Sequence, residues 1–207
     1  MKQIRYAASH TGPRSHLAAL LCAALLLGIL LVCPARVARA DDRVVGDGTP
    51  GSCTEADFDA ALAEAQAGDS GTITFDCGGE ATIILTSQKM LSGEVTIDGG
   101  DQITLSGGNT TRLFLVFGAV LHLKNITLSN GFSNTGDGGA INNSGVLTLQ
   151  NTSIRNSNVS SNFSGGAIVN YGPLTISDSH FENNAGGNGG SLYLRFEDGG
   201  AEISGST

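Results

Sequence analysis

Three stretches of the sequence are near copies of one another. Residues 121–130 read LHLKNITLSN, residues 147–156 read LTLQNTSIRN and residues 174–183 read LTISDSHFEN. They share the pattern L-x-[LI]-x-[ND]-x-x-[LIF]-x-N, and the spacings between their starts are 26 and 27. Weaker copies begin at Val95 and Ala201 and continue the same spacing in both directions. Self-similarity at a fixed period of this length predicts an architecture of stacked, similar units.

A second motif recurs between these copies. Residues 138–141 and 165–168 read GGAI, and residues 189–192 read GGSL, so the spacings are 27 and 24. Glycine adopts positive φ at little cost and leaves room where a side chain would not fit. The predicted corner glycines are Gly138, Gly139, Gly165, Gly166, Gly189 and Gly190.

The repeat predicts strands rather than helices. In the first copy Leu121 and Leu123 alternate with His122 and Lys124, which is the two-residue period of a strand. Each repeat holds about three short apolar pieces separated by Gly, Asn and Ser. Coils of three strands that stack at ~4.8 Å would form parallel sheets around a narrow interior. We therefore predict an all-β, right-handed parallel β-helix solenoid with a short N-terminal capping helix.

Recurring positions are expected to stack as ladders through the coils. Apolar members would fill the interior, while Asn and Asp would stand where a strand meets a turn and bond to one another. The predicted ladder residues are Leu121, Leu123, Asn125, Leu147, Leu149, Asn151, Leu174, Ile176 and Asp178. Leucine-rich repeats share the period, but their L-x-x-L-x-L-x-x-N frame does not fit, and a left-handed β-helix would need a six-residue period.

The first 40 residues are typical of an export signal. Basic residues open the segment, residues 17–32 are almost wholly apolar, and small residues follow. Cleavage is predicted at Ala38, Ala40 and Asp41. Sixteen apolar residues fall short of the ~20 that a spanning helix needs. We therefore predict a secreted or cell-surface protein with no membrane span after cleavage; an uncleaved anchor is the alternative.

Residues 41–78 are predicted to cap the first coil, and residues 79–207 to form the β-helix repeats. A helix at about 54–67, with Ser52 and Glu55 as a capping box, would precede a strand at about 72–77. The helix would present one apolar face, made of Phe58, Ala61, Leu62 and Ala65.

Two cysteines, Cys53 and Cys77, would remain after cleavage. An even count in an oxidising compartment predicts one disulfide, with two buried thiols as the alternative. Closing a loop of this length would contribute about 3 kcal/mol in the chain-entropy model.

Several of these motifs resemble those of bacterial surface proteins. DGTPGSCT at residues 47–54 and TITF at 72–75 resemble the opening of bacterial surface-exposed β-helix repeat proteins. The GGAI blocks and FENN at 181–184 resemble the G-G-A-I and F-x-x-N repeats of the polymorphic outer membrane protein family. The resemblance covers about residues 44–207. It implies an exported surface protein, often adhesive.

Charge excludes one class of partner. The first 40 residues hold five of the eleven basic residues and none of the nineteen acidic ones, which leaves −13 on residues 41–207. Nucleic-acid binding usually needs a basic patch, so we expect no nucleic-acid partner. The expected partners are glycans or cell-surface components.

No residue pattern predicts catalysis, a metal site or a cofactor. Asp98 and Asp101 flank two glycines and Asp137 precedes two more, which is typical of turns. His122 and His180 are expected on the surface. No basic residue of the exported part stands in an acidic cluster of the sequence; these residues are Arg43, Lys89, Arg112, Lys124, Arg155 and Arg195. The N-x-[ST] sequons follow from the Asn/Ser/Thr-rich composition and are not interpreted as glycosylation sites.

The last copy begins at Ala201 and stops at Thr207, before the position equivalent to Phe181. We therefore expect an incomplete last coil with an open edge that favours self-association. Three explanations stay open: a piece of a longer protein, a reading frame that ends early, or one half of an assembly.

Three functional hypotheses follow. The first is a non-enzymatic adhesive or structural β-helix protein. The second is a polysaccharide lyase or glycoside hydrolase on the same fold, which release of sugar ends from pectin or alginate would establish. The third is an ice- or surface-binding protein, for which His122, Thr148 and Thr175 form part of an outward row.

Overall fold

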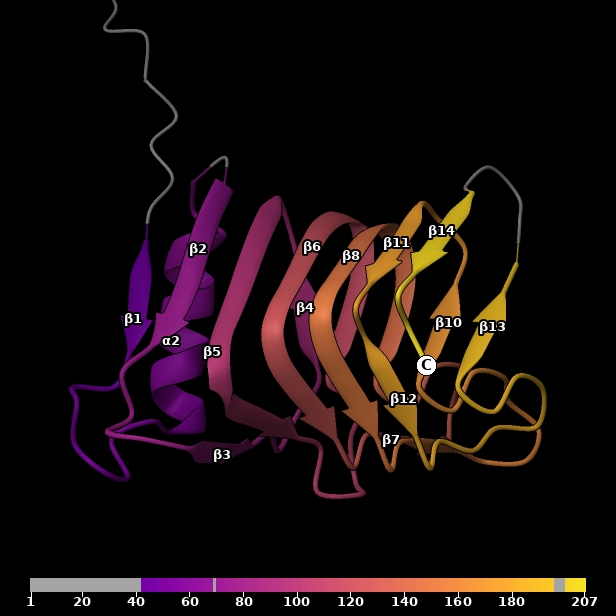
Figure 1. Cartoon of the computed structure of the whole chain (residues 1–207), viewed down its shortest axis with the longest axis horizontal. Coiled ribbons are helices and arrows are strands. Elements are labelled where there is room, and N and C mark those ends of the chain that lie inside the picture. The colour runs from indigo at the N-terminus through magenta and orange to yellow at the C-terminus, as the bar shows by residue number, and fades with distance from the viewer. Residues whose placement is uncertain (1–41, 69, 196–199) are drawn as a thin grey trace, which may run out of the picture. The chain divides into compact units, whose positions relative to one another are not determined.

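The computed structural model describes residues 42–207 except residues 69 and 196–199. The predicted signal over residues 1–40 and its cleavage positions Ala38, Ala40 and Asp41 lie outside the described residues. The described part is a parallel β-solenoid of about six turns with one short helix near its N-terminal end (Figure 1). The predicted parallel β-helix is thus confirmed. In the described part, no helix has the length and apolar character needed to cross a membrane.

The strands stack into three parallel walls, here named A, B and C. Three long strands bend around corners and belong to more than one wall: β5 (Glu94–Ser106), β6 (Phe114–Ser129) and β8 (Ile141–Arg155). Wall A adds β1 (Arg43–Val45), β2 (Ser70–Phe75), β11 (Leu174–Ser177) and β14 (Ala201–Ser204). Wall B adds β3 (Ala81–Ile84) and β12 (His180–Glu182). Wall C adds β4 (Lys89–Leu91), β10 (Ile168–Asn170) and β13 (Leu192–Leu194). A separate pair consists of β7 (Phe132–Ser133) and β9 (Asn158–Val159).

The interior of wall A consists of two apolar ladders. The first is Val95, Leu121, Leu147 and Leu174, which follow one another in register. The second is Ile97, Leu123, Leu149 and Ile176. All eight side chains are buried. Because side chains alternate between the two faces of a strand, a one-residue slip would place polar neighbours inside, so the leucine spacing determines the register.

The corner between walls A and B is a column of left-handed residues. Asn125, Asn151 and Asp178 have φ of 49°, 48° and 51°. Asn and Asp tolerate this conformation better than other non-glycine residues. The Nδ2 of Asn151 donates to Oδ1 of Asn125 at 3.0 Å, and the Nδ2 of Asn125 donates to Oδ1 of Asp98 at 2.9 Å. Side-chain bonds between coils therefore pin this corner.

The two glycines of each GG motif have different roles. The first ones, Gly138, Gly165 and Gly189, have φ of 76°, 68° and 61°. Two of the second ones, Gly139 and Gly166, lie against the next coil: a Cβ on Gly139 would stand 2.1 Å from the carbonyl oxygen of Gly166, and a Cβ on Gly166 would stand 2.2 Å from that of Gly190. The first glycine thus supplies the backbone conformation, and the second allows close approach.

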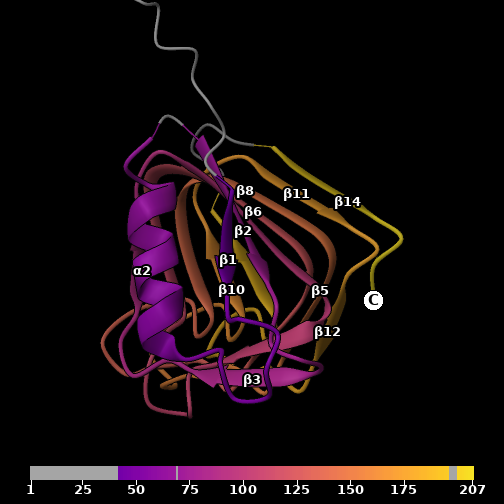
Figure 2. The same ribbon diagram turned by 90° about the vertical axis from the view of Figure 1, so that its left-hand side faces the viewer.

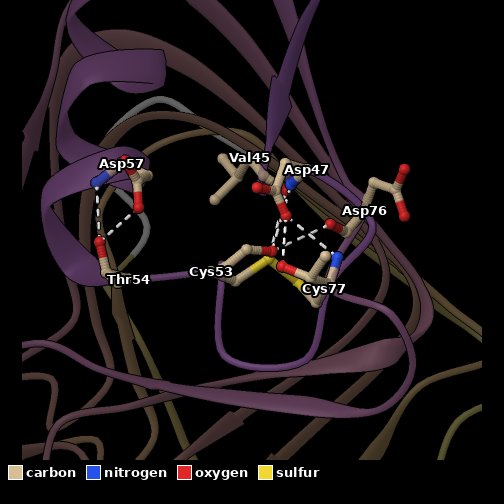
Figure 3. Close-up of a disulfide and its surroundings, with 9 residues drawn as sticks. Val45, Asp47, Cys53, Thr54, Asp57, Asp76 and Cys77 are labelled. Atoms are coloured by element: carbon tan, nitrogen blue, oxygen red, sulfur yellow. Dashed lines mark hydrogen bonds between the residues drawn. A yellow bond between two sulfur atoms is a disulfide. The ribbon is translucent and has the colours of Figure 1, made fainter.

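The capping helix α2 spans Glu55–Ala65 and begins differently from the prediction. Its N-cap is Thr54, whose side-chain oxygen accepts from the backbone N–H of Asp57 at 3.2 Å (Figure 3). The predicted capping box of Ser52 and Glu55 is therefore wrong. Ser52 instead accepts from the N–H of Asp47, because a tight turn precedes the helix, and Glu55 points to wall C.

The predicted disulfide between Cys53 and Cys77 is present beside this helix start (Figure 3). It joins the residue before the N-cap to the segment that follows β2, 24 residues later in the chain. The turn at residues 46–52 lies against the same segment, where Gly48 N–H donates to the carbonyl of Asp76 at 2.8 Å. The disulfide therefore ties the start of the helix to the end of β2 in wall A.

Helix α2 takes the place of a wall C strand in the first coil, because it precedes β2 as β4 precedes β5. Figure 2 shows it upright along one side of the N-terminal end. Its apolar face, Phe58, Ala61, Leu62 and Ala65, is buried in the common core. Side chains at its two ends accept from backbone N–H groups that flank β4: Gln66 from Ser92 at 2.6 Å and Glu55 from Thr86 at 2.8 Å. The helix thus covers a sheet edge that would otherwise leave unpaired groups.

The other end of the described solenoid is different. Within the described residues, β13 and β14 pair with a strand on one side only. A pocket of about 270 Å³ lies there, lined mainly by the apolar side chains of Ile176, Phe181, Leu192 and Ile203. Self-association through this end stays a prediction.

Candidate functional site

The outer face of wall B carries a row of polar side chains in register, one from each successive coil. Its members are Thr82, Thr104, Thr127, Ser153 and His180. Parallel strands repeat at ~4.8 Å, so each hydroxyl stands about that far from the next. The sequence predicted the place of His180 opposite Ser153 but not the length of the row, because the repeat is weak before residue 121.

Two adjoining hollows lie along this row. The larger, of about 430 Å³, is lined among others by Glu80, Thr82, Asp101, Gln102, Thr104, Thr127 and Arg155. The smaller, of about 150 Å³, is lined by Asp101, Asn125, Thr127, Asn151, Ser153, Asp178 and His180, with two neighbouring core residues. Asp101 and Thr127 belong to both hollows. These two residues therefore lie where the two hollows adjoin, and the two hollows together are named the polar depression.

The carboxylates at this corner are held in place by neighbouring groups. Oδ1 of Asp101 accepts from Nδ2 of Asn151 at 2.8 Å. Oδ1 of Asp98 accepts from the N–H of Gly100 at 3.0 Å, as in an Asx turn. At the far end of the row, Nδ1 of His180 lies 2.8 Å from Oγ1 of Thr207. Asp101 and His180, which line the depression, thus have defined positions.

Wall A carries a second outward row. It consists of Thr72, Thr96, His122, Thr148 and Thr175 in register. The sequence repeat identified the last three, and the structure adds the two threonines from the N-terminal coils. Nε2 of His122 lies 3.6 Å from Oε1 of Glu94 on the preceding coil. Glu202 of β14 pairs with Thr175 and extends the row by one coil. Four of its six members are therefore threonines, with one histidine and one glutamate.

A half-buried arginine, Arg112, lies between the turns of walls B and C. The sequence did not predict its contacts. The Arg112 guanidinium donates to the carbonyls of Gly138 and Asp137 at 2.7 and 2.8 Å, and to Ser133 and Gln88 at 3.0 Å. Burial lowers the pKa of Arg112, although the charge of Asp137 opposes this. The N–H groups of the guanidinium donate to oxygen atoms of the protein, so this side chain fixes the loop that contains Asp137.

Asp137 is more than the turn residue that its place in the sequence indicated. Its Oδ1 accepts from the N–H of Ser164 at 2.6 Å, and its Oδ2 accepts from the hydroxyl of Tyr171 at 3.1 Å. Burial and this hydrogen bond raise the pKa of Tyr171. The guanidinium of Arg195 lies 5.6 Å from the centre of the Tyr171 ring. The sequence could have indicated the place of Tyr171, because it directly follows Asn170, which pairs with Asn143 on the preceding coil.

The prediction that no basic residue stands in an acidic cluster is wrong for Lys89. The Nζ of Lys89 on β4 lies 2.7 Å from Oε1 of Glu55 and 2.7 Å from Oδ1 of Asp59, both on α2. The Lys89 side chain is only 5% exposed. Burial alone would raise the pKa of Glu55, but hydrogen bonds from Lys89 and Thr86 lower it to about 2. Only the tertiary structure brings these groups together, because the helix and β4 are separated in the sequence by two strands.

Among the described residues, no group of three or more His, Cys, Asp or Glu side chains could hold a metal ion. Comparisons with protein-family models, with curated proteins and with solved structures find no match. The resemblance to polymorphic outer membrane protein repeats therefore rests on the motifs quoted above.

Proposed function

We propose that the protein is an exported cell-surface or secreted β-helix protein with an adhesive or structural role, related to the polymorphic outer membrane protein repeats that its motifs resemble. The observation that carries this proposal is the polar outer face of wall B, with its two adjoining hollows. A rigid sheet presents similar groups at every coil, and many weak contacts to a repeating surface add up to strong retention. Glycans and other cell-surface components are the proposed partners.

The disulfide supports the proposed location. Cysteines stay reduced in most cytosols, so a structural disulfide is consistent with an extracellular site. The export signal predicted at residues 1–40 agrees with the same compartment.

The test is retention of the labelled full chain on immobilised glycans, extracellular matrix and whole cells. The same chain after reduction and unfolding serves as the control. We expect retention of the folded chain on at least one of these surfaces. Retention on none of them would contradict the proposal.

The threonines of wall A favour a second candidate, an ice- or mineral-binding face. Four threonines in register on a parallel sheet form a regular polar row, although His122 and its neighbour Glu94 interrupt it. Thermal hysteresis of the purified chain is the measurement, and its absence would remove the ice-binding candidate.

A further inference from the structure

We propose that the two hollows on wall B form one binding site for an uncharged glycan chain that lies along the solenoid axis. This inference rests on the proposed function and adds the face, the ligand class and the direction of the ligand. It concerns the depression centred on Asp101 and Thr127, which belong to both hollows.

The lining favours a ligand that donates hydrogen bonds. Three carboxylates, those of Glu80, Asp101 and Asp178, face the depression, against one cation, Arg155. An ionised carboxylate accepts hydrogen bonds and donates none. Sugar hydroxyls can donate to it, whereas the carboxylates of a uronate polymer cannot and would be repelled. The site therefore fits a neutral polyhydroxylated chain better than an acidic polysaccharide.

The direction of the ligand follows from the row of hydroxyls. Thr82, Thr104, Thr127 and Ser153 come from four successive coils, so the row runs along the axis in steps of ~4.8 Å. The two hollows adjoin along the same line. A chain along the axis would contact every member of the row, whereas a chain across the wall would contact one.

Hydrogen bonds within the protein hold the central carboxylate of the site. Oδ1 of Asp101 is held by Asn151 at 2.8 Å, and Asn151 is itself bonded to Asn125 at 3.0 Å. Groups that are fixed before binding lose less conformational entropy on binding.

The experiment is native affinity electrophoresis of the full chain in gels containing hydroxyethylcellulose, mannan or dextran, with polygalacturonate as the acidic polymer. Thr127→Val removes the hydroxyl shared by the two hollows and keeps a β-branched side chain. Thr74→Val is the matched control, because Thr74 lies on β2 of wall A, outside both outward rows and both hollows. Circular dichroism verifies that both variants keep the fold.

We expect retardation by at least one neutral polymer and none by polygalacturonate. Loss of one neutral hydrogen bond costs about 1 kcal/mol, so Thr127→Val should weaken binding about fivefold and Thr74→Val should leave it unchanged. Equal effects of the two variants, tighter binding of polygalacturonate, or no binding of any neutral polymer would overturn the inference. Retention on cells or matrix despite such a result would leave the adhesive function standing, whereas retention on no surface would remove both.

Discussion

Replacement of Lys89 by methionine tests how the capping helix is attached to the solenoid. Lys89 points into the first coil from β4 and its ammonium contacts two carboxylates of α2, Glu55 and Asp59, at 2.7 Å each. Methionine has a similar apolar length, so most of the packing of the lysine stem is kept. The substitution therefore removes the charge and leaves the two carboxylates without their cation.

The magnitude follows from the burial of the three groups. Exposed ion pairs contribute about 0–1 kcal/mol, and breaking a buried pair costs about 3–5 kcal/mol. Here the lysine is 5% exposed, Glu55 is 19% exposed and Asp59 is 48% exposed. The case lies between the two limits, so Lys89→Met should lower the free energy of unfolding by about 2 kcal/mol. The corresponding drop in Tm is about 4–8 °C for a chain of this size.

The assay is guanidinium denaturation at neutral pH, followed by far-ultraviolet circular dichroism, with Lys124→Met as the matched control. Lys124 is an outward, half-buried residue of β6, so its loss should change stability by less than about 0.5 kcal/mol. A double-mutant cycle with Glu55→Gln would isolate the coupling across the pair. The reasoning is refuted if the Lys89 and Lys124 variants lose the same stability, or if the cycle shows no coupling.

Three further predictions concern the same scaffold. The pKa of Glu55 falls from 4.5 to about 2 on folding, so its contribution to the free energy of unfolding should be complete above about pH 4.5 and disappear as the pH falls toward 2. Denaturant unfolding of Glu55→Gln and of the unchanged chain at a series of pH values should show a difference in stability of about 1–2 kcal/mol that closes over that range. Replacing both Cys53 and Cys77 by serine should cost about 3 kcal/mol in denaturant unfolding, and an unchanged midpoint would show that the disulfide does not constrain the unfolded chain. Gly139→Ala should lower the stability measured by thermal unfolding by about 2–3 kcal/mol, since its Cβ would stand 2.1 Å from a carbonyl oxygen. Gly68→Ala should be nearly neutral, because the nearest atom to its Cβ would be 3.7 Å away. Equal stabilities of the two variants would contradict the close approach of the coils.

Much of the fold could be predicted because each coil repeats the same local sequence pattern, with the same backbone preferences. The alternation around Leu121 requires a strand, and the return of the same alternation at Leu147 places one leucine over the other. The start of the helix could not be predicted as well. Thr54 and Ser52 are both good N-cap residues, and only the turn that engages Ser52 with Asp47 decides between them.

The candidate site was predictable only in part. Asp101, Thr127 and His180 could each be placed on a strand or corner, but a hollow depends on how coils of unequal length lie over one another. Asp137 and Tyr171 come together for the same reason, from coils 34 residues apart in sequence.

The sequence by itself determined the parallel β-helix, its register, its corner residues and the cysteine pair, because these follow from the period and from local backbone preferences. The tertiary structure alone decided the contacts outside these ladders: Lys89 with the two carboxylates of α2, Arg112 with the loop of Asp137, and the polar depression around Thr127. The physical reason is that a repeat specifies which position of one coil lies over the next, whereas hollows and charge contacts depend on the irregular turns and on the helix that replaces one strand.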